Sequence, residues 1–89
     1  MQALTTRETT LLIEGGAKVS SLKLVRVRHE GKRYYQIEFV LSARGAEKAS
    51  QLITTRNEPH RWADLNRAVA FVEQLFPGNN EIRLIVKNR

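Results

Sequence analysis

The stretch 33–42, RYYQIEFVLS, alternates between residues that favour a buried face and residues that favour water. This two-residue period is typical of a β-strand with one face in the core. The expected inner face holds Tyr35, Ile37, Phe39 and Leu41, and the outer face holds Tyr34, Gln36, Glu38 and Val40. The preceding stretch Val19–His29 also alternates, and a tight turn at Glu30–Lys32 separates the two, with Gly31 free to adopt a positive φ. The pattern therefore predicts an antiparallel β-hairpin.

Within Val19–His29, the apolar residues change sides partway along the strand. Leu22 and Leu24 share one face, whereas Val25 and Val27 share the other. One extra residue at this point would bring both halves onto the same face. The pattern therefore predicts a β-bulge between Leu24 and Val25.

A different period begins at Trp62. Apolar residues then recur at spacings of 3, 4, 3 and 4, at Trp62, Leu65, Val69, Val72 and Phe76. This spacing forms one apolar stripe of a helix from about Leu65 to Phe76. Asp64 suits the N-cap, because its carboxylate accepts from free amides of the first turn, and Pro77-Gly78 ends the helix.

The remaining segments complete a fold of the α+β class. Met1–Glu8 is a flexible arm or an early edge strand, Thr9–Glu14 is a strand ended by Gly15-Gly16, and Ala43–Ser50 is a loop. Further strands are expected at Gln51–Arg56, His60–Trp62 and Glu81–Lys87. The prediction is an antiparallel sheet of about five strands with one helix packed on one face, in the order β-β-β-β-α-β. Residues 1–89 form a single small domain, and the other sheet face stays open.

Charge narrows the class of partner. Lys and Arg number 15 against 9 Asp and Glu, which gives a net charge of +6 and a pI near 10.3. This balance favours anionic partners such as nucleic acid. The chain has no cysteine, no basic-then-apolar leader at its start and no apolar run of membrane-spanning length. We therefore expect a cytoplasmic protein that does not bind a membrane.

Catalytic signatures are missing from the sequence. The only histidines, His29 and His60, each adjoin an arginine, which makes the imidazole a weaker base and offers it no orienting carboxylate. The sequence has no nucleophile elbow, no zinc-ligand spacing and no glycine-rich phosphate loop. We therefore expect no enzymatic activity, no metal and no cofactor.

Basic residues concentrate in the predicted hairpin, in the stretch 23–35, KLVRVRHEGKRYY. From Lys18 to Tyr35 there are six Lys or Arg residues and one acid, Glu30. Arg26 and Arg28 lie two apart on one strand and so share a face, where their planar guanidinium groups suit phosphates. Tyr34 adds a ring on which an unstacked base can lie. The alternative is an ordinary solvated hairpin, in which the charges oppose edge-to-edge aggregation.

A second basic group surrounds the turn at Asn57 and includes Arg56 and Arg61. Arg61 precedes the predicted helix N-terminus, which is favourable for anions. The alternative is that Arg61 binds no ligand and only sets the position of Trp62, which we expect to join the helix to the sheet. We therefore expect Arg56 and Arg61 to be secondary contacts to the anionic partner, after those of the hairpin.

The stretch 52–86 resembles small proteins of plasmids and integrative conjugative elements. These carry a strand, a T-x-R turn, a helix start of the form R-[FW]-x-x-L-x-x-A and a closing strand; the matching positions here are Thr54, Arg56, Arg61, Trp62, Leu65 and Ala68. The resemblance implies DNA maintenance or single-strand handling. The basic strands followed by a helix also resemble transcriptional-coactivator single-strand binders, in which the curved sheet of a dimer holds the strand. Those proteins end at the helix, whereas this chain continues to Glu81–Lys87, so no residue roles carry over.

Together these patterns predict a non-catalytic nucleic-acid-binding protein, with DNA favoured over RNA and single strands slightly favoured over duplex. The expected contact residues are Lys23, Arg26, Arg28, Lys32, Arg33, Tyr34, Arg56 and Arg61. The alternative is a protein-interaction module whose open sheet edge pairs with a partner strand. A thin core and open edges are also compatible with a homodimer.

Overall fold

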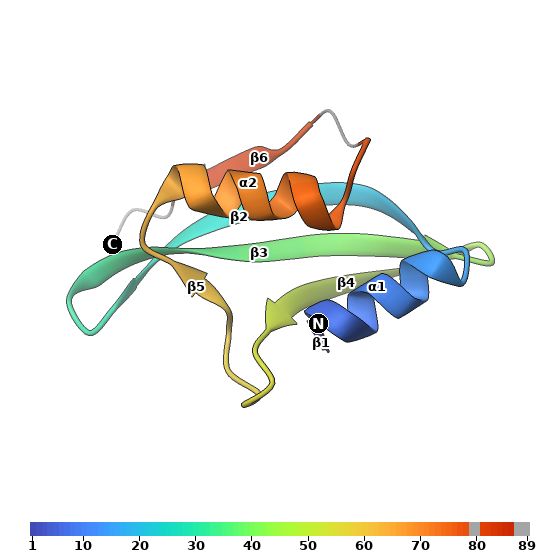
Figure 1. The fold of residues 1–89 in the computed structure, drawn as a ribbon, viewed down its shortest axis with the longest axis horizontal. Coiled ribbons are helices and arrows are strands. Elements are labelled where there is room, and N and C mark those ends of the chain that lie inside the picture. The colour runs from blue at the N-terminus through green and yellow to red at the C-terminus, as the bar shows by residue number, and fades with distance from the viewer. Residues whose placement is uncertain (79–80, 87–89) are drawn as a thin grey trace.

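The computed structural model describes residues 1–78 and 81–86. The elements are β1 (Gln2–Thr5), α1 (Thr6–Glu14), β2 (Lys18–His29), β3 (Lys32–Ala43), β4 (Ala46–Ile53), β5 (Arg61–Trp62), α2 (Leu65–Leu75) and β6 (Arg83–Val86). The strands form one sheet in the order β1-β4-β3-β2-β6, and β5 pairs with β3 beyond the end of β4 (Figure 1). The α+β class is confirmed.

The long β2–β3 hairpin is confirmed. His29 pairs with Lys32, so the loop consists of Glu30 and Gly31, with φ of 53° and 78° as a type I′ turn requires. The predicted bulge between Leu24 and Val25 is wrong, because the register runs straight through that point and shifts instead between Val19 and Ser21. Leu24 and Val25 are both buried, on opposite faces.

The predicted helix is confirmed as α2. Asp64 lies at its N-cap with extended backbone, and its carboxylate accepts from the amide of Asn66 at 2.8 Å. Ala68, Val72 and Phe76 pack into the core, where the Phe76 ring lies 5.1 Å from that of Phe39. The apolar stripe of the helix therefore covers the inner face of the hairpin.

The predicted strand at Thr9–Glu14 is wrong, because this segment belongs to helix α1. Thr5 and Glu8 form a capping box: the Thr5 side chain accepts from the Glu8 amide at 3.1 Å, and Glu8 accepts from the Thr5 amide at 2.9 Å. The fold therefore has two helices among its described residues rather than one. Ahead of α1, Gln2–Thr5 forms the early edge strand.

The sheet is mixed rather than purely antiparallel. β1 runs parallel to β4, and β6 runs parallel to β2 at the opposite edge. Ala43–Ser50, expected as a loop, instead contains a tight turn and most of β4, which ends at Ile53 rather than at Arg56. The returning strand expected at His60–Trp62 is present as β5. Lys87, the expected end of the last strand, lies outside the described residues.

Both helices pack on the same face of the sheet. Residues of α2 belong to the core cluster, and Ile13 of α1 packs against that same cluster. The inner-face residues of the hairpin are its most buried ones, such as Ile37 at 0% and Phe39 at 2% exposed. The opposite face, which carries Tyr34, Gln36, Glu38 and Val40, is covered by neither helix (Figure 1). We call this uncovered face the open face.

The β3–β4 turn offers a test of the hairpin geometry. Its two loop residues, Arg44 and Gly45, have φ of 52° and 80°, and a residue with a Cβ is strained in that region. The left-handed conformation costs an ordinary residue about 1–2 kcal/mol, and asparagine tolerates it better, so we expect Arg44→Asn to raise the free energy of unfolding by up to about 1 kcal/mol. Urea denaturation measures this change. Arg44→Ala is the control, since it also removes the exposed charge and should bring no gain.

Candidate nucleic-acid interface

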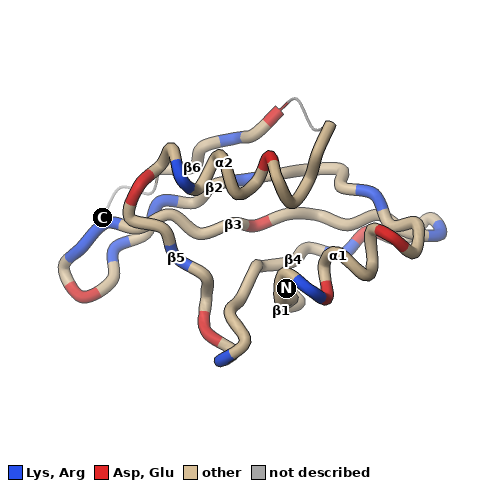
Figure 2. The backbone as a smooth tube through the Cα atoms, in the orientation of Figure 1, with Lys and Arg blue, Asp and Glu red and all other residues tan. Residues whose placement is uncertain are grey.

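The β2–β3 hairpin extends past the rest of the described sheet. The last row in which β2 and β3 have other described neighbours contains Arg26 and Tyr35, which pair with Val86 and Trp62. We call the ribbon beyond this row, Val27–Tyr34, the hairpin end. In Figure 2 its two strands and its turn carry several basic segments and one acidic one. Three basic side chains, Arg28, Lys32 and Arg33, together with His29, are therefore presented by a narrow two-stranded ribbon.

Arginines gather on the helix side of this ribbon. Arg28 lies directly opposite Arg33, and Arg26 lies two positions before Arg28 on the same face of β2. Like charges directly opposite on a sheet destabilise the pair. Among the described residues, neither Arg28 nor Arg33 has a carboxylate within 4 Å; the ion pair at this end joins His29 Nε2 to Glu30 Oε1 at 3.9 Å. Arg28 and Arg33 are both exposed and so remain available to an external anion.

The other predicted contacts of the hairpin lie on the open face. The register places Lys23, Lys32 and Tyr34 there, together with His29. The Tyr34 ring lies 6.3 Å from the His29 ring in an edge-on arrangement. The sequence interpretation grouped these residues with the arginines as one cluster. The structure divides the cluster between two faces that meet at the hairpin end.

Arg61 and Arg56, the secondary contacts, have different positions. Arg61 pairs with Gln36 across β5 and β3, so its side chain is on the open face. Its Nε is buried and has no hydrogen-bond partner among the described residues. Arg56 lies in the loop between β4 and β5, which Figure 1 shows well away from the hairpin end. Arg61 therefore joins the candidate site, and Arg56 does not.

Sequence reasoning missed a pair of amides at the centre of the open face. Gln51 Nε2 donates to Gln36 Oε1 at 2.8 Å, and Gln36 is 8% exposed. This contact depends on the pairing of β3 with β4, and much of β4 was expected to be a loop. Arg83 of β6, opposite Lys23, adds a further charge to the same face.

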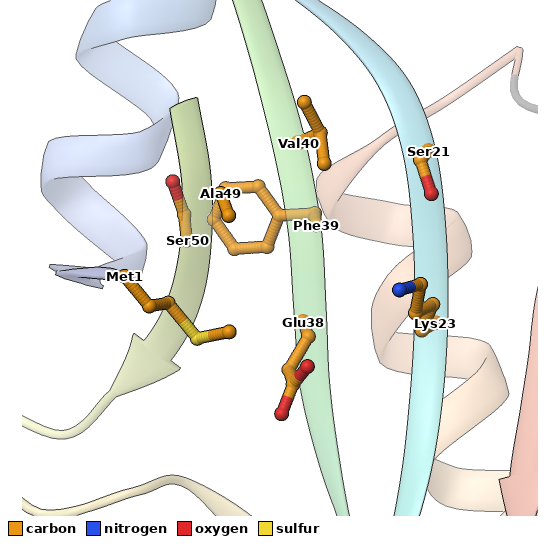
Figure 3. A pocket seen from close by; sticks show the side chains of 8 residues that line it. All are labelled: Met1, Ser21, Lys23, Glu38, Phe39, Val40, Ala49 and Ser50. Carbon is orange, nitrogen blue, oxygen red and sulfur yellow. The ribbon is translucent and has the colours of Figure 1, made fainter. Parts of the chain in front are cut away.

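A shallow hollow lies on the open face toward β1. Figure 3 shows the side chains of Ser21, Lys23, Glu38 and Val40 around it, on neighbouring strands, with Met1 at one side. Its volume is about 40 Å³. Sites for small organic ligands usually enclose about 300 Å³ or more. The hollow is therefore too small to hold a cofactor.

His60 packs among aromatic rings rather than toward the basic residues. Its ring stacks on Trp62 at 3.9 Å and meets Phe71 of α2 edge-on at 5.6 Å. Trp62 also contacts Phe71, at 4.9 Å, which confirms that it joins the helix to the sheet. Burial lowers the pKa of His60 below the usual value, because the imidazolium would lose hydration.

This environment predicts how stability depends on pH. Because the folded-state pKa of His60 lies below its unfolded value, the unfolded chain binds more protons as pH falls below about 6.5. We expect the free energy of unfolding to fall over that range, as measured by urea titrations at several pH values. His60→Phe should reduce this dependence, whereas His29→Asn, at the exposed hairpin end, should preserve it.

Neither a metal site nor a membrane-spanning helix is found within the described residues. No group of three or more His, Cys, Asp or Glu side chains is arranged there to hold a metal ion. No helix there is long and apolar enough to cross a membrane. Comparisons of the chain with protein-family models, with curated proteins and with solved structures give no significant match.

Proposed function

We propose that this protein is a non-catalytic nucleic-acid-binding module that contacts phosphates through its basic hairpin end. DNA is favoured over RNA, and single strands are slightly favoured over duplex. The observation that carries the proposal is the directly opposed pair Arg28 and Arg33, with Arg26 beside it. These like charges repel one another in the free protein, and a bound polyanion would relieve that repulsion.

The residue types support phosphate recognition in particular. Each guanidinium presents several donors in a plane and can bond two phosphate oxygens at once. Arg26, Arg28 and Arg33 are the principal phosphate contacts in this proposal. Lys32, on the other face of the ribbon, is a further one, and Lys23 lies at the margin. A strand that crosses the hairpin end therefore meets cations from both faces.

Fluorescence anisotropy with labelled single-stranded and double-stranded DNA of matched length tests the proposal. Phosphate contacts release counterions, so affinity should fall steeply between about 50 and 200 mM salt. A tighter complex with the single strand would agree with the strand preference. If neither DNA binds even at the lower salt concentration, the proposal is wrong.

A protein-interaction module is the second candidate, and the β6 edge favours it. Leu84 and Val86 of this edge strand are 48% and 43% exposed. A partner strand, from another protein or from a second copy of the chain, could add to this edge and cover both side chains. Backbone pairing responds weakly to salt, so complex formation that persists at high salt would favour this candidate over phosphate binding.

A further inference from the structure

The open face lies directly beside the hairpin end and continues from it across the sheet. Along β3, Tyr34 and Gln36 follow one another on this face, about 7 Å apart at the usual rise of a strand. Gln51 then lies beside Gln36 on β4, and Arg61 lies beside it on β5. A ligand that leaves the hairpin end along β3 therefore meets the Tyr34 ring, then the Gln36 amide with the Arg61 guanidinium group beside it, and then the Gln51 amide.

These groups match the chemistry of nucleobases. The half-buried Tyr34 offers an aromatic face, and bases of any sequence stack on such rings. Gln36 and Gln51 are held together by one hydrogen bond, and amides can both donate to and accept from base edges. The unpartnered, buried Nε of Arg61 lacks a hydrogen-bond acceptor within the described protein. A buried donor without a partner is costly, so movement of the Arg61 side chain toward an acceptor on a bound ligand would be favourable.

Charge selects a polyanion for this face. In the half of the open face between Lys23 and the turn, the register places four cations, Lys23, Lys32, Arg61 and Arg83, beside Glu38, and the only other acid there is Glu30 in the turn, next to His29. The excess of positive charge lies on both sides of the Tyr34 and Gln36 row. An acidic peptide would satisfy the charges but would leave the aromatic and amide groups without their best partners.

We propose that the open face binds the unstacked bases of a single nucleic-acid strand, with Tyr34 as the stacking platform and Gln36, Gln51 and Arg61 as polar contacts. This inference rests on the proposed function, because the hairpin end supplies the phosphate contacts from which the strand continues. Base binding on the open face requires that single strands bind more tightly than duplex DNA. In a duplex the bases are paired and the pairs are stacked on one another, so the faces of the bases cannot reach Tyr34.

The test compares two labelled oligonucleotides of equal length, one with ordinary bases and one abasic throughout, by fluorescence anisotropy. Both carry the same phosphates, so the hairpin end binds both. We expect the wild-type protein to bind the base-bearing strand more tightly. We expect Tyr34→Ala to weaken that complex by about 5- to 150-fold, the range for loss of one base–aromatic stack, and to leave abasic binding nearly unchanged. Tyr34→Phe, which keeps the ring, should bind like wild type.

The remaining outcomes separate the two proposals. Equal, salt-sensitive binding of both oligonucleotides would overturn base binding on the open face and leave phosphate binding intact. Tighter binding of a duplex of the same sequence would also overturn it, in favour of a basic ribbon that enters a groove. Failure to bind any of the three would overturn both proposals. Circular dichroism of each variant checks that the fold is retained. If Tyr34→Ala is destabilised, the comparison of base-bearing with abasic strands by the wild-type protein still decides the question.

Discussion

Reversal of charge at Arg28 and Arg33 is expected to weaken binding of single-stranded DNA by about 100-fold at low salt. Each arginine contributes a charged hydrogen bond to phosphate, and two such contacts together are worth roughly this factor. The slope of log affinity against log salt should become shallower by about 1.4, since each phosphate contact to a single strand contributes about 0.7. Anisotropy titrations over a range of salt concentrations measure both quantities.

The single variant Arg28→Glu separates binding from stability. Its glutamate would lie directly opposite Arg33, so an opposed pair of like charges becomes an attractive pair. We expect the free energy of unfolding to rise by about 0.2–1 kcal/mol while DNA binding weakens. The matched control is Arg7→Glu, which makes the same change in net charge on α1. If the control weakens binding as strongly, only overall charge matters and the hairpin end is not the site.

Replacement of Phe39 by alanine is expected to cost about 3–5 kcal/mol of unfolding free energy. Phe39 is 2% exposed and packs against Phe76 at the end of α2, so its removal leaves a cavity between sheet and helix. Small domains have a total stability of about 5–15 kcal/mol, so this loss is a large part of it. Urea denaturation monitored by circular dichroism measures the change.

Val40 is the matched control for this prediction. It follows Phe39 on β3 but lies on the open face, where it is only partly buried. We expect Val40→Ala to cost about 1 kcal/mol, because less apolar surface is lost. Equal losses at Phe39 and Val40 would contradict the assignment of an inner and an open face.

The hairpin and α2 could be predicted because their periodicity agreed with their turn and capping residues. The segment of α1 could not be predicted from β-propensity, since Thr9–Glu14 is rich in β-forming residues. Its signal was instead Thr5 followed by Glu8, the spacing of a capping box, which the structure forms. Local capping therefore outweighed propensity in this segment.

Strand β4 was partly missed because of its composition. Ala46–Ser50 contains alanine, lysine and glutamate, which are depleted in strands, and it pairs because β3 offers it an edge. The parallel pairing of β1 with β4, and of β6 with β2, depends on where the chain crosses the sheet, and no local pattern encodes that. The wrong bulge prediction assumed that every buried residue of the strand shares one face. Val25 is 3% exposed although it lies on the open face, where Gln36 of β3 and Ile85 of β6 are its neighbours in the register.

The candidate site was predictable in composition and less so in geometry. A two-residue loop at Glu30 and Gly31 makes Arg28 face Arg33, so this pair follows from the turn. The division of the basic residues between two faces follows from strand alternation once the register is known. Arg61 lies beside Gln36 because β5 pairs with β3. Strand β5 has two residues, too few for the sequence to show which strand it pairs with.

The most direct test of phosphate binding at the hairpin end is a nuclear magnetic resonance titration of the ¹⁵N-labelled protein with a single-stranded DNA oligonucleotide. We predict that the largest amide and arginine side-chain shifts will fall on residues 26–34, and that they will weaken as salt is raised. Shifts centred on the β6 edge, or no shifts at low salt, would contradict the account and leave a protein partner as the better explanation of this surface.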